Sequence, residues 1–211
     1  MAAPSMEALV APPGVAVVTS ECQQGVLGDP AVFPELAAVA RATALPNVVR
    51  LVEAARDAGV PVVHALAVRR PDGRGASANA RLFAAAARAP VALAPGSDAA
   101  ALVPELAGDD RDLTSVRGHG LGPMAGTDLD PVLRNLGTRT LVVTGVSVNV
   151  AVTNLVMDAV NLGYQVVLPR DAVAGVPAAY AQEVLDRTLS LLATVCTTDE
   201  VVAVWRGGGA S

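Results

Sequence analysis

At 211 residues the chain is long enough for one well-buried domain and short for two. Its formal net charge is −5, and it has no basic patch interleaved with aromatic residues, so we expect no nucleic-acid partner. No apolar run reaches the roughly 18 residues that a membrane-spanning helix needs, so we expect no membrane partner. The N-terminus lacks the features of a secretory signal, and we expect a cytoplasmic protein.

Strand and helix signals alternate along the chain, with no internal repeat. Three prolines predict a flexible arm over residues 1–13, followed by a single domain over residues 14–206. Short runs typical of buried parallel strands occur at 14–20, 60–68, 112–118, 140–146, 164–172 and 195–196. Helical spacing and capping residues predict helices at 47–58, 79–88, 99–102, 127–135, 150–162, 177–192 and from 197 onward.

This alternation predicts a three-layer α/β/α sandwich with a parallel sheet of about six strands. Ligands bind such sheets beyond the carboxyl ends of the strands. The segments that follow the strands, where we expect the site, are 19–24, 64–75, 117–126, 145–151 and 170–176.

One of these segments resembles a known motif. Residues 141–151 read LVVTGVSVNVA, which is similar to the T-G-V-x-T-N-V-C-V turn that carries the nucleophilic cysteine of the isochorismatase-like hydrolases. The preceding segment GTDLDPVLRNLGTRT and the following segment DAVNLGYQVVLPRDA match the same family. The likeness covers roughly residues 14–205 and identifies the chain as a divergent member that has alanine, Ala151, at the nucleophile position.

The resemblance implies a catalytic set of Glu21, Arg117 and Ala151, at positions where the family's cysteine hydrolases have Asp, Lys and Cys. A methyl side chain cannot attack a carbonyl, so thiol catalysis from position 151 is excluded. Glu21 would act as general acid or base, unless it serves only as a structural partner of Arg117. Arg117 would bind substrate charge or only neutralise Glu21, and Gly118 or His119 can also fill the lysine position.

The resemblance further implies a polar cradle of backbone amides from Val146 to Ala151. The expected substrate-binding residues are Gln23, His119, Val146, Ser147 and Val150. True isochorismatases have glycine at the nucleophile position and need no covalent intermediate. Ala151 is closer to that arrangement, although the turn typical of that subgroup is absent.

The remaining reactive side chains have simpler interpretations. His64 lies within a predicted strand and is expected to be a hydrogen-bonded core histidine. Cys22 should point away from Glu21 into the core, and Cys196 should also be buried. The two histidines lie far apart in a pattern that does not make a metal site, and we expect no cofactor.

Two functional hypotheses follow. The first is a hydrolase or lyase that acts on a small organic substrate by acid/base chemistry without a cysteine nucleophile. The second is an inactive homologue that binds a small ligand or a protein partner in the inherited pocket. The chain is only 17% charged, so we also expect a homodimer or homotetramer, with helices 79–88 and 150–162 as interface elements.

Overall fold

The computed structural model describes residues 4–207, and it confirms the predicted α/β/α architecture. The sheet has seven strands in the order β3-β2-β1-β4-β5-β7, with β6 paired to β4, and every pairing between these strands is parallel. The strands are β1 (Val15–Ser20), β2 (Val62–Ala67), β3 (Leu113–Arg117), β4 (Thr140–Val146), β5 (Gln165–Pro169), β6 (Val173–Ala174) and β7 (Thr194–Cys196).

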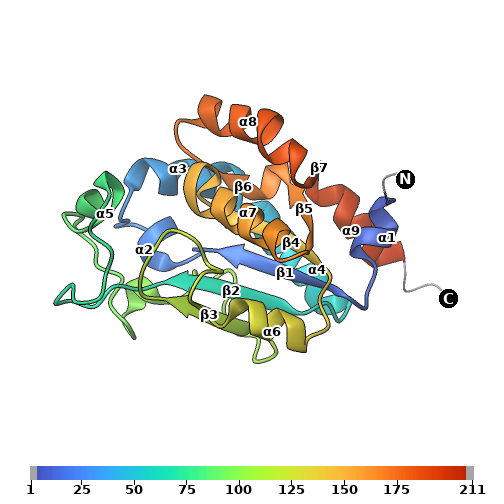
Figure 1. Cartoon of the computed structure of the whole chain (residues 1–211), viewed down its shortest axis with the longest axis horizontal. Coiled ribbons are helices and arrows are strands. Elements are labelled where there is room, and N and C mark those ends of the chain that lie inside the picture. The colour runs from blue at the N-terminus through green and yellow to red at the C-terminus, as the bar shows by residue number, and fades with distance from the viewer. Residues whose placement is uncertain (1–3, 208–211) are drawn as a thin grey trace.

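Helices cover both faces of the sheet (Figure 1). One face packs against α1 (Met6–Val10), α2 (Gln24–Leu27), α3 (Pro34–Thr43), α4 (Leu45–Asp57) and α9 (Thr198–Gly207). The other face packs against α6 (Leu129–Asn135), α7 (Thr153–Asn161) and α8 (Ala178–Arg187). The short helix α5 (Arg81–Ala86) lies apart from both layers, and none of its residues is buried. None of the described helices is long and apolar enough to cross a membrane.

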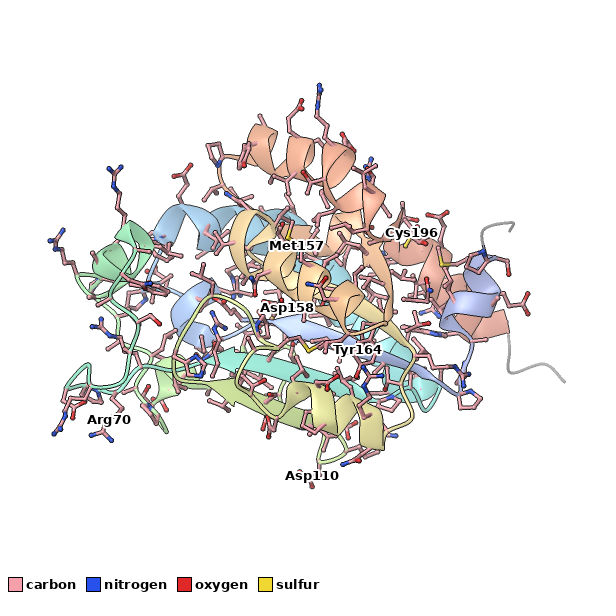
Figure 2. All side chains as sticks on the ribbon, viewed as in Figure 1. Arg70, Asp110, Met157, Asp158, Tyr164 and Cys196 are labelled. Atoms are coloured by element: carbon pink, nitrogen blue, oxygen red, sulfur yellow. The ribbon has the colours of Figure 1, made fainter. Side chains whose placement is uncertain are left out.

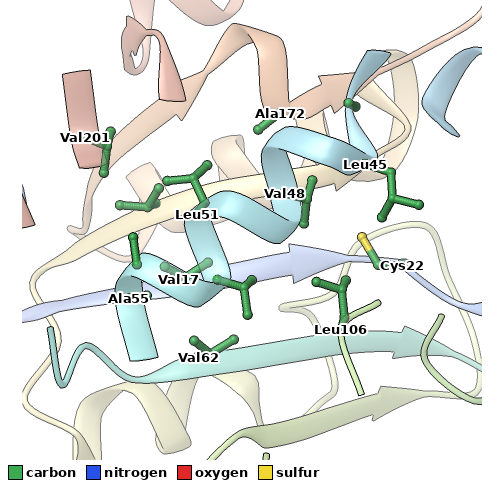
Figure 3. Close-up of a cluster of buried hydrophobic side chains, with 14 of the residues drawn as sticks. Val17, Cys22, Leu45, Val48, Leu51, Ala55, Val62, Leu106, Ala172 and Val201 are labelled. Carbon is green, nitrogen blue, oxygen red and sulfur yellow. The ribbon is translucent and has the colours of Figure 1, made fainter. Parts of the chain in front are cut away.

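The core on the first face consists mainly of Val, Leu and Ala, as the low aromatic content requires (Figure 3). Helix α4 places Val48, Leu51 and Ala55 on one side, where they are almost fully buried beside Val17 of β1. Truncating a leucine in such a core costs about 2–5 kcal/mol, because the cavity that remains is only partly filled. This packing holds the central strands rigidly in place.

The segment predicted to be a flexible arm contains a docked helix instead. Residues 1–3 lie outside the described part of the chain, but α1 begins at Met6 and buries Leu9 and Val10. Trp205 of α9 donates its indole N–H to the Val10 carbonyl oxygen at 2.8 Å. The prediction of a flexible arm rested on the prolines of this segment. The helix is held by a contact with a residue 195 positions away in the sequence, which no local pattern reveals.

His64 is fully buried and hydrogen-bonded at both ring nitrogens, which confirms its predicted structural role. Nδ1 lies 2.8 Å from the Thr19 hydroxyl, and Nε2 lies 3.0 Å from a carboxylate oxygen of Asp112. Arg56 binds the same carboxylate at 2.5 Å. Burial lowers the pKa of His64 below its ordinary value of 6.5, and the hydrogen bond to Asp112 opposes that shift.

The network predicts a stability that falls in acid. Because the folded chain holds His64 at a lowered pKa, the unfolded chain binds more protons below about pH 6.5. The free energy of unfolding should therefore decrease as pH falls below 6.5, by up to about 1.4 kcal/mol per pH unit for this group. The free energy of unfolding, measured in urea between pH 5 and 8, should lack this pH-dependent decrease in His64→Asn. His119→Asn, at the chain's other histidine, should retain the decrease. If the unfolding free energy of both variants had the same dependence on pH, the assignment of this effect to His64 would be contradicted.

Candidate active site

Glu21 follows β1 directly and has a backbone conformation unusual for a residue with a side chain. Its φ angle is +54°, in the left-handed region, which costs roughly 1–2 kcal/mol for a non-glycine residue. Hydrogen bonds on either side fix the turn: the Glu21 N–H donates to the Ala65 carbonyl oxygen, and the Gln23 N–H donates to that of Glu21. The turn directs Glu21 into the cavity, while Cys22 enters the core. Such local strain is common at functional sites.

Arg117 is the last residue of β3 and reaches Glu21 across the intervening strand. The two positions are two strands apart, about 10 Å at the usual strand spacing. Arg117 pairs in register with Ala67 of β2, whose small side chain leaves room for the guanidinium to pass. Nη2 of Arg117 donates to Oε1 of Glu21 at 2.6 Å, which is a charge-assisted hydrogen bond.

Only part of the Arg117 guanidinium is satisfied. The residue is 9% exposed, and its Nη1 group is buried with no hydrogen-bond partner among the described residues. A buried unpaired donor is costly, and a cationic one more so. The pairing with Glu21 therefore does not account for the whole guanidinium, although Nη1 itself is enclosed by protein and has almost no accessible surface. Arg117, and not His119, contacts the carboxylate.

The third part of the site is the turn after β4. Gly145 pairs with Ser20 and lies so close to it that a Cβ there would be 2.3 Å from the Ser20 carbonyl oxygen. A single π-helical turn then spans Val148–Val152 and leads into α7, bringing Ala151 to the cavity wall. The N–H groups of Val150 and Val152 donate to the Ser147 carbonyl oxygen. These two amides of the expected cradle are thus already engaged.

These elements surround a cavity of about 710 Å³ at the carboxyl edge of the sheet. Among the predicted site residues, Glu21, Arg117, Ala151, Ser147, Val150 and His119 line this cavity. Sequence reasoning missed the apolar residues that line it further from the sheet, including Phe33 and Phe83. Their segments follow no strand directly, so the rule that places ligand sites at strand ends did not reach them.

Gln23 and Val146 lie outside the described lining of the cavity. The Gln23 side chain is fully buried: its amide nitrogen donates to the carbonyl oxygens of Ala67 and Ala100, and its oxygen accepts from the Ala67 N–H. The Val146 carbonyl oxygen accepts a hydrogen bond from the Ser20 hydroxyl. Both residues connect strand ends through hydrogen bonds. They therefore position the strand ends around the cavity and do not line it, as their expected role in substrate binding would require.

His119 lies on the loop between β3 and α6, exposed and at the cavity wall. A Cβ on Gly126 would lie 2.9 Å from the His119 ring, so the glycine allows the imidazole to lie against the backbone. Gly120 of the same loop donates its N–H to the Ser77 hydroxyl at 2.9 Å. This bond joins the two loops that border the cavity. Within residues 4–207 no group of three His, Cys, Asp or Glu residues is arranged to hold a metal ion.

Neither cysteine lines the cavity in the described structure. Cys22 is fully buried in the core, and burial with the nearby Glu21 carboxylate raises its pKa to about 12 (Figure 3). Burial also raises the pKa of Cys196 to about 12. Figure 2 shows Cys196 on the opposite side of the molecule from Arg70, which lines the cavity. Both thiols are free and confirm the predicted burial.

The family model described as the isochorismatase domain matches residues 15–200. The chain belongs to the isochorismatase family. This match extends from the start of β1 into α9 and so includes all the strand ends that form the cavity.

Solved structures of this family share the fold. A cysteine hydrolase from Pseudomonas syringae pv. phaseolicola 1448A superposes with a TM-score of 0.79 at 25% identity, covering 92% of each chain. An isochorismatase family protein from Burkholderia thailandensis gives a TM-score of 0.75 at 27% identity, covering 92% of this chain and 97% of the other.

A curated relative, the uncharacterized isochorismatase family protein YwoC of Bacillus subtilis, is 38% identical over 78 residues. That match covers 37% of this chain and only 41% of the relative's length. It supports the family assignment and carries no further information on activity.

The buried thiols predict slow alkylation of the folded protein. With pKa values of about 12, only a very small fraction of either thiol is ionised at pH 8, and the thiolate is the reactive form. Iodoacetamide should therefore add no label in minutes to the native protein and two labels in urea, as read by intact mass. Ala151→Cys, which adds a thiol at the cavity wall, should gain one label under native conditions. Rapid native labelling of Cys22 would contradict the assignment to the core.

Proposed function

We propose that this isochorismatase-family protein hydrolyses a small organic substrate by acid/base chemistry at Glu21, without a cysteine nucleophile. The observation that carries the proposal is the Glu21–Arg117 pair, which lies at the sheet edge of a large cavity that neither cysteine lines. The carboxylate is held in one orientation by a charged hydrogen bond, as a positioned acid or base must be.

The reaction that these groups fit best is hydrolysis of a carboxamide by water. The Glu21 carboxylate accepts a proton from water as the water oxygen attacks the carbonyl carbon. The guanidinium of Arg117, which lines the same cavity, stabilises the carbonyl oxygen as negative charge develops there. The C–N bond then breaks, and Glu21 returns the proton to the departing nitrogen. The products are a carboxylic acid and ammonia or an amine, with the enzyme unchanged.

A second candidate is a homologue that binds a ligand without turning it over. The specific observation in its favour is the closed Glu21–Arg117 pair, since a carboxylate oxygen that already accepts a hydrogen bond from arginine is less available to a water molecule. In that case the same pocket would bind small molecules, and ammonia release from carboxamides would not exceed the rate measured in buffer without the protein.

Glu21→Gln tests the acid/base role. Gln keeps the shape, and its carbonyl oxygen can still accept the hydrogen bond from Arg117, but it cannot take a proton. Ammonia release from a panel of primary carboxamides should fall by about 10²-fold or more, with little change in melting temperature. Glu35→Gln is the matched control, because Glu35 also lines the cavity but lies exposed on α3. A fully active Glu21→Gln enzyme would remove Glu21 from the mechanism.

Ala151→Cys tests whether the thiol mechanism can be restored by one change. We expect less than a tenfold gain in kcat/KM over Ala151→Ser, measured as ammonia release. The new sulfur would face a carboxylate bound to Arg117, and arginine cannot release a proton near neutral pH. A gain of several orders of magnitude would show that the remaining site still supports covalent catalysis.

We also propose that the chain assembles into a homodimer or homotetramer. Large apolar side chains remain exposed on α7 and α8 and just after them: Met157 (Figure 2) and Leu162 are each 40% exposed, Tyr180 is 56% exposed and Leu191 is 81% exposed. Exposed apolar surface of this kind often marks an interface. Light scattering at micromolar concentration should give two or four times the chain mass of 21.2 kDa, and a monomer mass would contradict the proposal.

A further inference from the structure

The cavity extends well beyond the Glu21–Arg117 pair. Its volume of about 710 Å³ lies within the range of roughly 300–1,000 Å³ found for sites that hold drug-sized ligands. A carboxamide group needs only the small part next to the sheet. The remaining space is bordered by the start of α3 on one side and by α5 with the loop after it on the other.

This outer part of the cavity is mainly apolar and contains both phenylalanines of the chain, although Glu35, Arg69, Arg70 and Asp72 also line the cavity. The sequence has only two Phe, and the core is built almost entirely without aromatic residues. Phe33 precedes α3 and Phe83 lies on α5, and both are only partly buried. Leu82 and Leu93 line the same region. Large aromatic side chains that remain partly exposed in a cavity offer apolar area for a ligand to cover.

Helix α5 gives a second indication. The helix is six residues long, apolar at five positions, and no residue on it is buried. Its residues Leu82, Phe83 and Ala86 face the cavity, while Leu82 is still 36% exposed. A short helix is marginal without packing of an apolar face. An apolar group inside the cavity would supply that packing.

The cavity is polar at its Glu21–Arg117 end. The ligand group that binds there, called its head, must therefore complement these two side chains. Arg117 and Glu21 both line the cavity at this end, the first with hydrogen-bond donors and the second with acceptors. A carboxamide presents the complementary pair, because its oxygen accepts and its N–H donates.

We propose that the substrate is a carboxamide joined to an extended apolar arm, of the size of an aryl group or a medium-length hydrocarbon chain. The head lies at Glu21 and Arg117, and the arm lies between Phe33 and Phe83. This inference rests on the proposed amide hydrolysis for the identity of the head, whereas the arm rests on the outer cavity alone.

Calorimetric titration of Glu21→Gln with the straight-chain primary amides from butanamide to octanamide tests the inference without turnover. Affinity should rise about fourfold with each methylene, the gain expected for a fully buried CH₂ group. Phe83→Ala should weaken octanamide binding by about tenfold and change butanamide binding less than twofold. Leu82→Ala should act in the same direction with a smaller effect. Leu136→Ala, which truncates an exposed apolar side chain outside the cavity, should leave the series unchanged.

The outcomes separate this inference from the proposed function. An affinity that does not increase with chain length, or an increase that Phe83→Ala leaves intact, would overturn the apolar arm even if the wild type hydrolysed short amides. An increase that depends on Phe83 would support it. Full hydrolytic activity of Glu21→Gln would overturn the proposed function, and the dependence of KM on chain length in that active variant would then test the apolar arm.

Discussion

The pairing of β1 with β4 in the middle of the sheet is the constraint on which the site depends. The two strands run in register over six residue pairs, from Val15 with Thr140 to Ser20 with Gly145. Strand β1 leaves the sheet directly after this last pair, into Glu21, and β4 continues for one more residue before the turn at Val148–Val152 that contains Ala151. A slip of one residue would turn every side chain to the opposite face. The register therefore places the carboxylate and the nucleophile position on one cavity.

The Glu21–Arg117 pair then limits which chemical roles the side chains of the site can take. A buried ion pair contributes little net stability, because removing both charges from water offsets most of their attraction. One member of the pair, Glu21, also has a strained backbone conformation. A site that orients charge explains an ion pair at such a residue better than a need for stability does. Arginine also remains charged throughout the neutral range, so it can stabilise an oxyanion but cannot pass a proton to it. Under the proposed function, proton transfer at the base of the cavity is therefore left to Glu21.

Local patterns in the sequence predicted the strands well, because buried parallel strands appear as continuous apolar runs. The runs ending at Ser20, Ala67 and Val146 were found within a few residues. Helix α3 was missed, although its proline at the first position and its apolar residues at Leu36, Ala37 and Ala40 carried a helical signal.

The site was predicted only as far as its residues follow strands. Glu21, Arg117 and Ala151 meet at the cavity because strand ends meet at one edge of the sheet. The role of Gln23 depends on backbone groups 44 and 77 residues away, which no local pattern reveals. The apolar outer cavity likewise depends on how the loop from 69 to 97 folds back over α3, a tertiary arrangement without a periodic signature.

The contact between Trp205 and Val10 joins the first and last described helices at the end of the molecule away from α5 (Figure 1). The contact between α1 and α9 favours circular permutation, because a connection between these two helices need not cross the sheet. New ends opened in the exposed segment near Gly75 would then lie beside the cavity. In a permuted protein, a reporter fused at those new ends would sense occupation of the pocket directly.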